Sequence, residues 1–196
     1  MESNDKFQSI IKALEKQLKE NDHLTVAIEG RCGSGKSTLS KLLGETFDCN
    51  AFHMDDFFLP FEMKTKERLA KPGGNVHYER FKEEVLNPIK NSESISYRPY
   101  NCAVRALDEP IHSSPKKLSL IEGVYSLHPS LANAYDYKIF MTVDFQTQLK
   151  RIAKRNGEEK LQMFINQWIP LEEHYFSSLD VEKQCDYILN TTDLWD

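Results

Sequence analysis

Short, mostly apolar runs alternate with amphipathic segments along the whole chain. Five of these runs read as buried strands, and they cover residues 24–29, 50–55, 116–123, 137–144 and 186–190. Between them, apolar residues recur at spacings of three and four, which predicts helices. These helices cover about residues 4–20, 37–47, 78–89, 146–156 and 161–179. The alternation predicts an α/β fold with a five-stranded, mostly parallel sheet and helices on both faces.

Two features interrupt this pattern. Residues 64–75 are polar and end in Pro72-Gly73-Gly74-Asn75, which predicts a loop. Pro170 lies inside the last amphipathic segment and predicts a bend or break in that helix. No internal repeat or domain boundary is visible, so we expect the 196 residues to form a single domain.

Composition excludes several classes of partner. The formal net charge is -5, which argues against a broad nucleic-acid surface. No apolar run approaches the ~20 residues of a membrane span, and the N-terminal residues lack the apolar core of a signal peptide. The four cysteines form no CxxC pair, so a zinc site is not expected. We therefore expect a cytoplasmic protein that binds neither nucleic acid nor membrane.

A glycine-rich stretch, EGRCGSGKST, follows the first predicted strand and opens the next helix. Its spacing, Gly30-x-x-x-x-Gly35-Lys36-Ser37, fits the Walker A pattern, in which backbone N–H groups cradle phosphates. Lys36 is expected to reach the β- and γ-phosphates of ATP, and the Ser37 hydroxyl to bind Mg²⁺. The expected nucleotide-binding residues are Gly30, Arg31, Cys32, Gly33, Ser34, Gly35, Lys36, Ser37 and Thr38. The alternative is a turn that only links a strand to a helix, but the strand-loop-helix context favours nucleotide binding.

Acidic residues follow two other predicted strands. Asp55 and Asp56 end the second strand, and Glu122 ends the third. The carboxyl ends of parallel strands lie at one edge of the sheet, beside the glycine loop. These acids are therefore candidates to support magnesium, although acids at strand ends also cap helices or solvate loops.

Two further observations separate a kinase from a nucleotide switch. A GTP switch is expected to carry DxxG and NKxD motifs, and neither is present. A cationic stretch holds Lys150, Arg151, Lys154 and Arg155, which suits a lid that neutralises a transferring phosphate. The alternative is a solvated basic face paired with Glu158 and Glu159.

Together these motifs resemble the uridine kinase-like branch of the P-loop uridine kinase and phosphoribulokinase group. The resemblance covers about residues 24–190 and rests on EGRCGSGKST, HMDDFF, GGNVHYERF, YRPYNCAVR, LIEGVYSLHP and RIAKRNGEEKLQMFINQWIPLEEHYF. It implies the five-stranded sheet of P-loop NTPases. It also implies that Asp55 deprotonates the acceptor hydroxyl, Glu122 serves magnesium, and Arg151 and Arg155 belong to the lid.

On the acceptor side, the resemblance implies that Phe58 lines a nucleoside pocket and that Tyr100 packs near the base. Established uridine kinases carry Asp-Ser-Phe-Tyr where this chain has Asp-Asp-Phe-Phe. Arg105 stands near the place of a family histidine, and His77 or Glu79 stands near that of an acid that grips ribose. These differences from the family sequence affect residues expected to bind the acceptor rather than residues expected to bind ATP.

We therefore expect a kinase that transfers the γ-phosphate of ATP to a hydroxyl, with Mg²⁺ held by Ser37, Glu122 and Asp55. Lys36, Asp55, Arg151 and Arg155 are the expected catalytic residues. A pyrimidine ribonucleoside is the first candidate acceptor, bound by Phe58, His77, Tyr100 and Arg105. Alternatives are pantothenate, a sugar phosphate, another nucleoside, or a nucleotide-binding regulator without turnover. The lid is expected at about residues 150–165 and the acceptor-binding subregion at about 56–112, while a homo-oligomer is left open.

Overall fold

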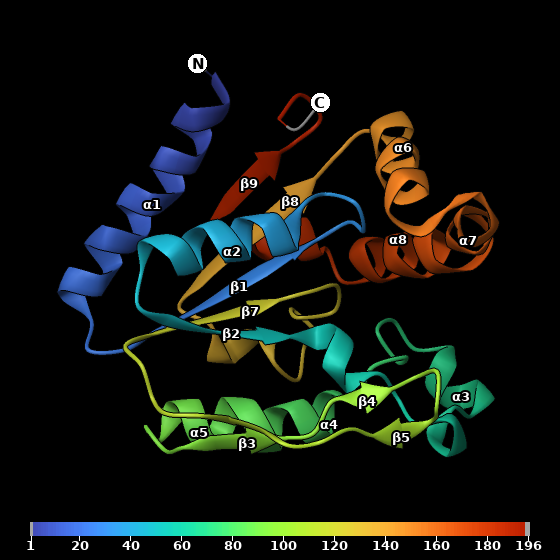
Figure 1. The fold of residues 1–196 in the computed structure, drawn as a ribbon, viewed down its shortest axis with the longest axis horizontal. Coiled ribbons are helices and arrows are strands. Elements are labelled where there is room, and N and C mark those ends of the chain that lie inside the picture. Colours follow the sequence, from blue (N-terminus) through green and yellow to red (C-terminus); the bar gives the residue numbers. More distant parts are fainter. Residues whose placement is uncertain (1, 195–196) are drawn as a thin grey trace.

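The structure of the protein, a computed structural model, describes residues 2–194, with side chains from residue 6 onward. Its central sheet has five parallel strands in the order β2-β7-β1-β8-β9 (Figure 1). The strands are β1 (Leu24–Gly30), β2 (Cys49–His53), β7 (Leu118–Glu122), β8 (Tyr137–Thr142) and β9 (Tyr187–Asn190). Each lies within, or one residue beyond, a run that the sequence predicts, so the five-stranded α/β fold is confirmed.

Two apolar layers cover the sheet because alternate side chains of each strand point to opposite faces. Val26 and Ile28 pack with α1 (Glu2–Glu20) and α2 (Lys36–Thr46). Ala27 points the other way, into a second layer that includes Phe81 and Tyr175. This layer is formed by α4 (Tyr78–Phe81), the helical turns η3 (Lys82–Leu86) and η6 (Val181–Gln184), and α8 (Ile169–Ser178). Burial on both faces explains why β1 reads as a continuous apolar run.

The remaining helices follow the sequence pattern with two differences. They are η1 (Met54–Phe57), η2 (Phe61–Met63), α3 (Lys66–Leu69), α5 (Asn87–Lys90), η4 (Ala132–Ala134), α6 (Phe145–Asn156), α7 (Glu158–Met163) and η5 (Phe164–Trp168). The predicted loop 64–75 contains α3, because the Thr65 side chain accepts the Arg68 N–H and caps a helical turn. The expected bend at Pro170 takes the form of the π-helical turn η5, since proline has no N–H to continue the regular pattern.

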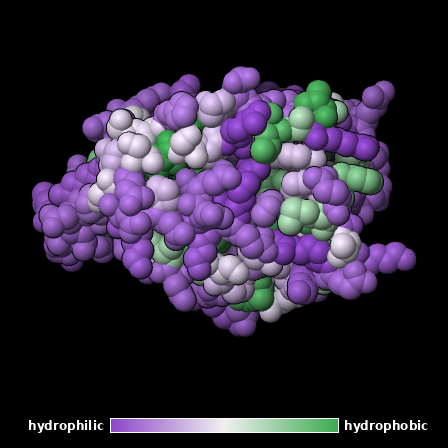
Figure 2. Space-filling model, turned by 90° about the horizontal axis from the view of Figure 1, so that it is seen from below, coloured by the Kyte–Doolittle hydropathy of each residue, from purple (hydrophilic) through white to green (hydrophobic). Residues whose placement is uncertain are grey.

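Residues between β2 and β7 form a layer beside the sheet. Four short strands lie here: β3 (Ile95–Tyr97), β4 (Tyr100–Asn101), β5 (Ala106–Leu107) and β6 (Ile111–Ser113). They pair as β3 with β6 and β4 with β5, both antiparallel. Seen from this side, the surface is mostly hydrophilic, with hydrophobic side chains in small groups (Figure 2). Within residues 2–194, no helix combines the length and hydropathy that crossing a membrane requires.

A buried acid at the end of β1, Glu29, connects this strand to the segment after β7 and to α8. Glu29 is fully buried, and its carboxylate accepts hydrogen bonds from four groups. The donors are the Gly30 N–H at 2.9 Å, the Tyr175 hydroxyl at 3.0 Å, the Leu127 N–H at 3.1 Å and the Ser126 hydroxyl at 3.3 Å. Burial raises the pKa of Glu29 to about 7, against the lowering effect of these donors and of Lys36.

Candidate active site

The glycine loop lies between β1 and α2, as the Walker A pattern predicts. Gly33 and Gly35 adopt φ values of 75° and 89°, a left-handed conformation that side chains with a Cβ disfavour. Lys36 folds back over the loop, and its Nζ donates to the carbonyl oxygens of Gly30 and Arg31 at 2.7 and 3.0 Å. The loop therefore presents its N–H groups and a lysine ammonium at the N-terminus of α2, which suits a polyphosphate.

Two adjacent glutamates of α8 hold the start of this loop. The Arg31 guanidinium pairs with both carboxylate oxygens of Glu173 at 2.6 and 3.0 Å and donates to Thr142 Oγ1 at 2.8 Å. The Cys32 N–H donates to Glu172 Oε2 at 2.9 Å. The Arg31 side chain is therefore committed to α8, and burial raises the pKa of the Cys32 thiol. Among the expected nucleotide-binding residues, these two anchor the loop.

Ser37 and Glu122 offer the hard oxygen donors that Mg²⁺ prefers. The Ser37 hydroxyl donates to Glu122 Oε1 at 3.0 Å, and His53 Nδ1 lies 2.6 Å from the same oxygen. Burial raises the pKa of Glu122, but the hydrogen bond with His53 and the charge of Lys36 outweigh it, so the net pKa is lowered. Glu122 is thus held ionised. Within residues 2–194 no group of three or more His, Cys, Asp or Glu side chains is arranged to hold a metal alone. A hydroxyl and one carboxylate fit Mg²⁺, which usually takes its other ligands from phosphates and water.

The two neighbouring aspartates that follow β2 have different surroundings. Asp55 lines the pocket, and burial raises its pKa, while nearby Lys36 opposes that shift. Asp56 is turned to the other side, where its Oδ2 accepts the Tyr97 hydroxyl at 2.9 Å. The structure therefore separates the expected base, Asp55, from its neighbour.

The cationic stretch ends α6 and reaches the same pocket. Arg151, Lys154 and Arg155 all line it. The Arg151 guanidinium donates to the Thr191 carbonyl at 2.7 Å and the Thr191 hydroxyl at 3.0 Å, which ties it to the end of β9. Arg155 donates to the Asn156 side chain at 2.7 Å and lies 6.0 Å from the centre of the Phe164 ring. The two arginines thus have distinct settings, with Arg155 near Asp55 and Arg151 part of the scaffold.

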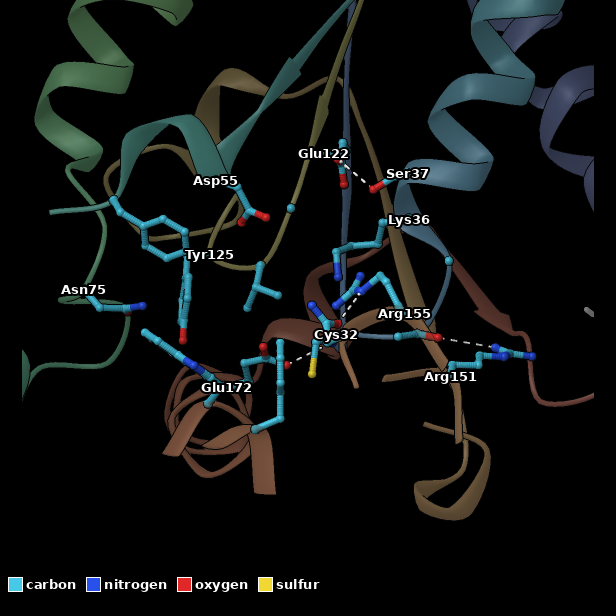
Figure 3. A pocket seen from close by; sticks show the side chains of 18 of the residues that line it. Cys32, Lys36, Ser37, Asp55, Asn75, Glu122, Tyr125, Arg151, Arg155 and Glu172 are labelled. Atoms are coloured by element: carbon cyan, nitrogen blue, oxygen red, sulfur yellow. Dashed lines mark hydrogen bonds between the residues drawn. The ribbon is translucent and has the colours of Figure 1, made fainter. Parts of the chain in front are cut away.

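One cavity of about 900 Å³ is lined by residues of the glycine loop, by Asp55 and Glu122, and by Arg151 and Arg155 (Figure 3). Of the expected residues, the structure brings eleven to its wall: Cys32, Gly33, Gly35, Lys36, Ser37, Thr38, Asp55, Phe58, Glu122, Arg151 and Arg155. Other expected acceptor residues stand elsewhere. His77 caps α4, Tyr100 is buried in β4, and exposed Arg105 stacks on Phe61 with 4.7 Å to the ring centre. Gly30, Arg31 and Ser34 support the loop from outside the cavity wall.

The cavity also contains residues that the sequence pattern does not single out. These are Lys64, Asn75, Cys102, Gly123, Val124, Tyr125, Asn156, Phe164, Trp168 and Glu172, and Lys154 of the expected cationic stretch lines the cavity with them. Trp168 lines the cavity, where its ring centre lies 6.2 Å from that of Phe58. Tyr175 and Phe176, two aromatics of α8, belong to the core. Asn75 follows a turn signal and Glu172 lies on an ordinary helix, so only the tertiary structure reveals them.

Comparison with known proteins gives a fold-level match. No protein-family model matches the sequence, and no curated protein has a matching sequence. A solved structure of a possible uridine kinase from Bacillus stearothermophilus is similar with a TM-score of 0.73 and 20% identity, over 96% of this chain and 100% of that one.

Two further solved structures are also similar. The YGR205w protein has a TM-score of 0.60 and 15% identity, over 94% of this chain and 93% of that one. A proposed fructose transport system kinase from Silicibacter sp. TM1040 has a TM-score of 0.56 and 22% identity, over 86% of this chain and 90% of that one. The chain thus has the fold of P-loop kinases, and its resemblance to the uridine kinase-like branch is confirmed at the level of fold.

Proposed function

We propose that this protein is a kinase that transfers the γ-phosphate of ATP to a hydroxyl group of a small molecule. The observation that carries the proposal is that one cavity contains the glycine loop with Lys36, the Ser37–Glu122 pair, the carboxylate of Asp55 and the lid cation Arg155. A phosphate donor, a magnesium site, a base and a charge-stabilising cation are what phosphoryl transfer requires. A passive nucleotide binder has no need of a carboxylate such as that of Asp55 in the same cavity as its phosphate loop.

In the proposed reaction, the hydroxyl oxygen of the acceptor forms a bond to the γ-phosphorus, and Asp55 accepts the proton that this hydroxyl loses. The bond between the γ-phosphorus and the β–γ bridging oxygen breaks, and ADP leaves with that oxygen. Lys36 and the loop N–H groups hold the phosphates, and Arg155 stabilises the charge on the transferring group. The raised pKa of Asp55 suits a base, because it increases the affinity of the carboxylate for the proton.

Ser37 and Glu122 would hold Mg²⁺, with Asp55 close to the same place. When bound, the ion would neutralise charge on the β- and γ-phosphate oxygens. Glu122 suits this role because His53 and Lys36 lower its pKa and keep its carboxylate ionised despite burial.

The regions around the cavity divide into two proposed parts. Residues of about 150–165 form the lid, since Lys154, Arg155 and Phe164 reach the cavity from this segment. Residues of about 56–112 form the acceptor-binding subregion, since Phe58, Lys64, Asn75 and Cys102 line the cavity from there. The whole chain would act as one kinase domain in the cytoplasm.

A pyrimidine ribonucleoside is the first acceptor to test. The paired rings of Phe58 and Trp168 offer apolar surfaces for a planar or ring-shaped group. Pantothenate, sugar phosphates and other nucleosides are the competing acceptors.

The test is acceptor-dependent ADP release, measured by a coupled assay with uridine, cytidine and the competing acceptors. ADP release with uridine or cytidine supports the full proposal. Release with another acceptor supports the kinase and replaces the substrate. Nucleotide binding without acceptor-dependent release by any of them would instead identify a regulator.

A further inference from the structure

Three polar side chains line the cavity apart from the proposed magnesium site and the proposed base. Asn75 comes from the loop before α4, Tyr125 from the segment after β7, and Glu172 from α8. Figure 3 shows the three along one side of the pocket, away from Ser37 and Arg151. We call them the acceptor wall.

Asn75 is held in place by its backbone while its side chain keeps a spare donor. The Arg68 guanidinium binds the carbonyls on either side of it, those of Gly74 and Val76, each at 3.0 Å. The Asn75 carbonyl accepts the Leu59 N–H at 2.9 Å. Gly74 allows this turn, because a Cβ there would lie 1.9 Å from the Arg68 carbonyl oxygen. Yet the Asn75 Nδ2 is buried with no hydrogen-bond partner among the described residues.

Tyr125 shows the same combination of a fixed frame and an unused polar group. Its φ of 76° is in the left-handed region, and its ring packs edge-to-face on Tyr175 with 4.9 Å between ring centres. Only 4% of the residue is exposed, and its hydroxyl makes no hydrogen bond of good geometry within the described residues, although the Asn75 side chain lies beside it. Leaving such a group unpaired costs free energy, and a bound ligand would remove that cost.

Glu172 adds an acceptor of hydrogen bonds. It is 6% exposed, and its Oε2 accepts the Cys32 N–H, so this carboxylate connects the acceptor wall to the glycine loop. Burial raises its pKa, and the charge of Lys36 opposes that shift. A carboxylate in this position attracts hydroxyl or amine hydrogens and repels anions.

We propose that Asn75, Tyr125 and Glu172 recognise the acceptor and select an uncharged molecule with adjacent hydroxyl groups. The inference rests on the proposed kinase function. One ligand hydroxyl can accept from the Asn75 amide or pair with the Tyr125 hydroxyl, and a neighbouring hydroxyl can donate to Glu172. The sugar of a nucleoside and a free sugar both meet this description, with Phe58 and Trp168 against their ring faces.

Anionic acceptors fit this wall poorly. Most cavity cations belong to the phosphate loop or to α6, namely Lys36, Arg151, Lys154 and Arg155. Lys64, beside Cys102, is the one other lysine or arginine that the structure places in the lining. A carboxylate or phosphate group of an acceptor at the wall would therefore lie near the negative charge of Glu172, with no lysine or arginine of the wall to pair with it. This argues against pantothenate and sugar phosphates.

The experiment uses the full-length protein and two variants that preserve shape, Tyr125→Phe and Glu172→Gln. Glu173→Gln is the matched control, because Glu173 also holds the loop, through the Arg31 side chain, but does not line the cavity. Two measurements are made with uridine, cytidine and ribose as uncharged acceptors, and with pantothenate and ribose 5-phosphate as anions. The first is kcat and KM for ADP release. The second is calorimetric binding of each acceptor in the presence of a non-hydrolysable ATP analogue and Mg²⁺.

We expect an uncharged acceptor to bind and react, with KM or Kd raised about tenfold or more in both variants. Glu172→Gln should also reduce the preference for uncharged over anionic acceptors, and Glu173→Gln should leave that preference as in the wild type. Tyr125→Phe should leave the melting temperature unchanged or higher, since its hydroxyl has no internal partner, whereas a structural hydroxyl would lower it.

The outcomes separate this inference from the proposed function. Preferred turnover of an anion, or unchanged acceptor KM and Kd in both variants, overturns the acceptor wall and leaves the kinase in place. Acceptor binding that weakens in both variants, with no ADP release from any acceptor, overturns the kinase and leaves the wall. No binding and no turnover with any of the acceptors, uncharged or anionic, overturns both.

Discussion

The Ser37 hydroxyl donates a 3.0 Å hydrogen bond to Glu122, which joins the first turn of α2 to the end of β7. We expect Glu122→Gln to raise the Mg²⁺ concentration for half-maximal activity, because the amide removes the charge at the proposed metal site. Loss of such a contact typically costs ~10- to 100-fold in metal affinity or activity. The check is activity against free Mg²⁺ at fixed ATP, and an unchanged Mg²⁺ dependence would remove Glu122 from the metal site.

Asp55→Asn should lower turnover by ~10²- to 10⁴-fold, because it removes the proposed general base while nearly preserving shape. Nucleotide binding should persist, since the glycine loop remains intact. Asp56→Asn is the matched control: Asp56 binds the Tyr97 hydroxyl outside the cavity, so its loss should affect stability more than turnover. Titration of nucleotide binding and acceptor-dependent turnover on the same preparations decides the matter. Near-normal turnover of Asp55→Asn would contradict the assignment.

Arg155→Ala should reduce kcat more than it weakens ATP binding, because the guanidinium is expected to contact the transferring phosphate mainly in the transition state. Arg151→Ala should instead lower the melting temperature, since Arg151 binds Thr191 at the end of β9. Steady-state kinetics, nucleotide titration and thermal unfolding of both variants distinguish these effects. Unchanged kcat in Arg155→Ala would leave that residue on a solvated basic face.

Glu29 should make stability depend on pH. Its pKa rises from 4.5 to about 7 in the folded protein, so the folded state binds this proton more tightly than the unfolded chain. The resulting stabilisation is full below about pH 4.5 and is lost as pH rises to about 7. The shift corresponds to about 3 kcal/mol, as an order of magnitude.

Glu29→Gln provides the comparison, because glutamine does not titrate. The difference in unfolding free energy between wild type and variant should fall from pH 4.5 to pH 7 and then level off. Urea unfolding across this range measures it. A difference that stays constant would show that Glu29 has an ordinary pKa.

The sequence predicts the sheet well and the acceptor side poorly, for a physical reason. The five strands are buried on both faces, and the phosphate loop needs glycines at fixed spacing, so both leave strong local patterns. Strands β4 and β5 have two residues each, too few for any periodicity. Asn75, Tyr125 and Glu172 come from three distant segments, and each has ordinary neighbours along the chain. His77 and Arg105 show the opposite problem. Their side chains suit acceptor binding and they lie within motifs of the resemblance, yet neither lines the cavity.

Neighbouring glutamates on α8 bind neighbouring residues of the phosphate loop, Glu173 to Arg31 and Glu172 to Cys32. The chain reaches α8 from α6 through α7 and η5, so the same continuous stretch contains the proposed lid and the anchor of the loop. A ligand that moves α8 must also strain or move the backbone of the loop. Thermodynamic linkage then makes the influence mutual: whatever free energy acceptor binding contributes to nucleotide affinity, nucleotide binding returns to acceptor affinity.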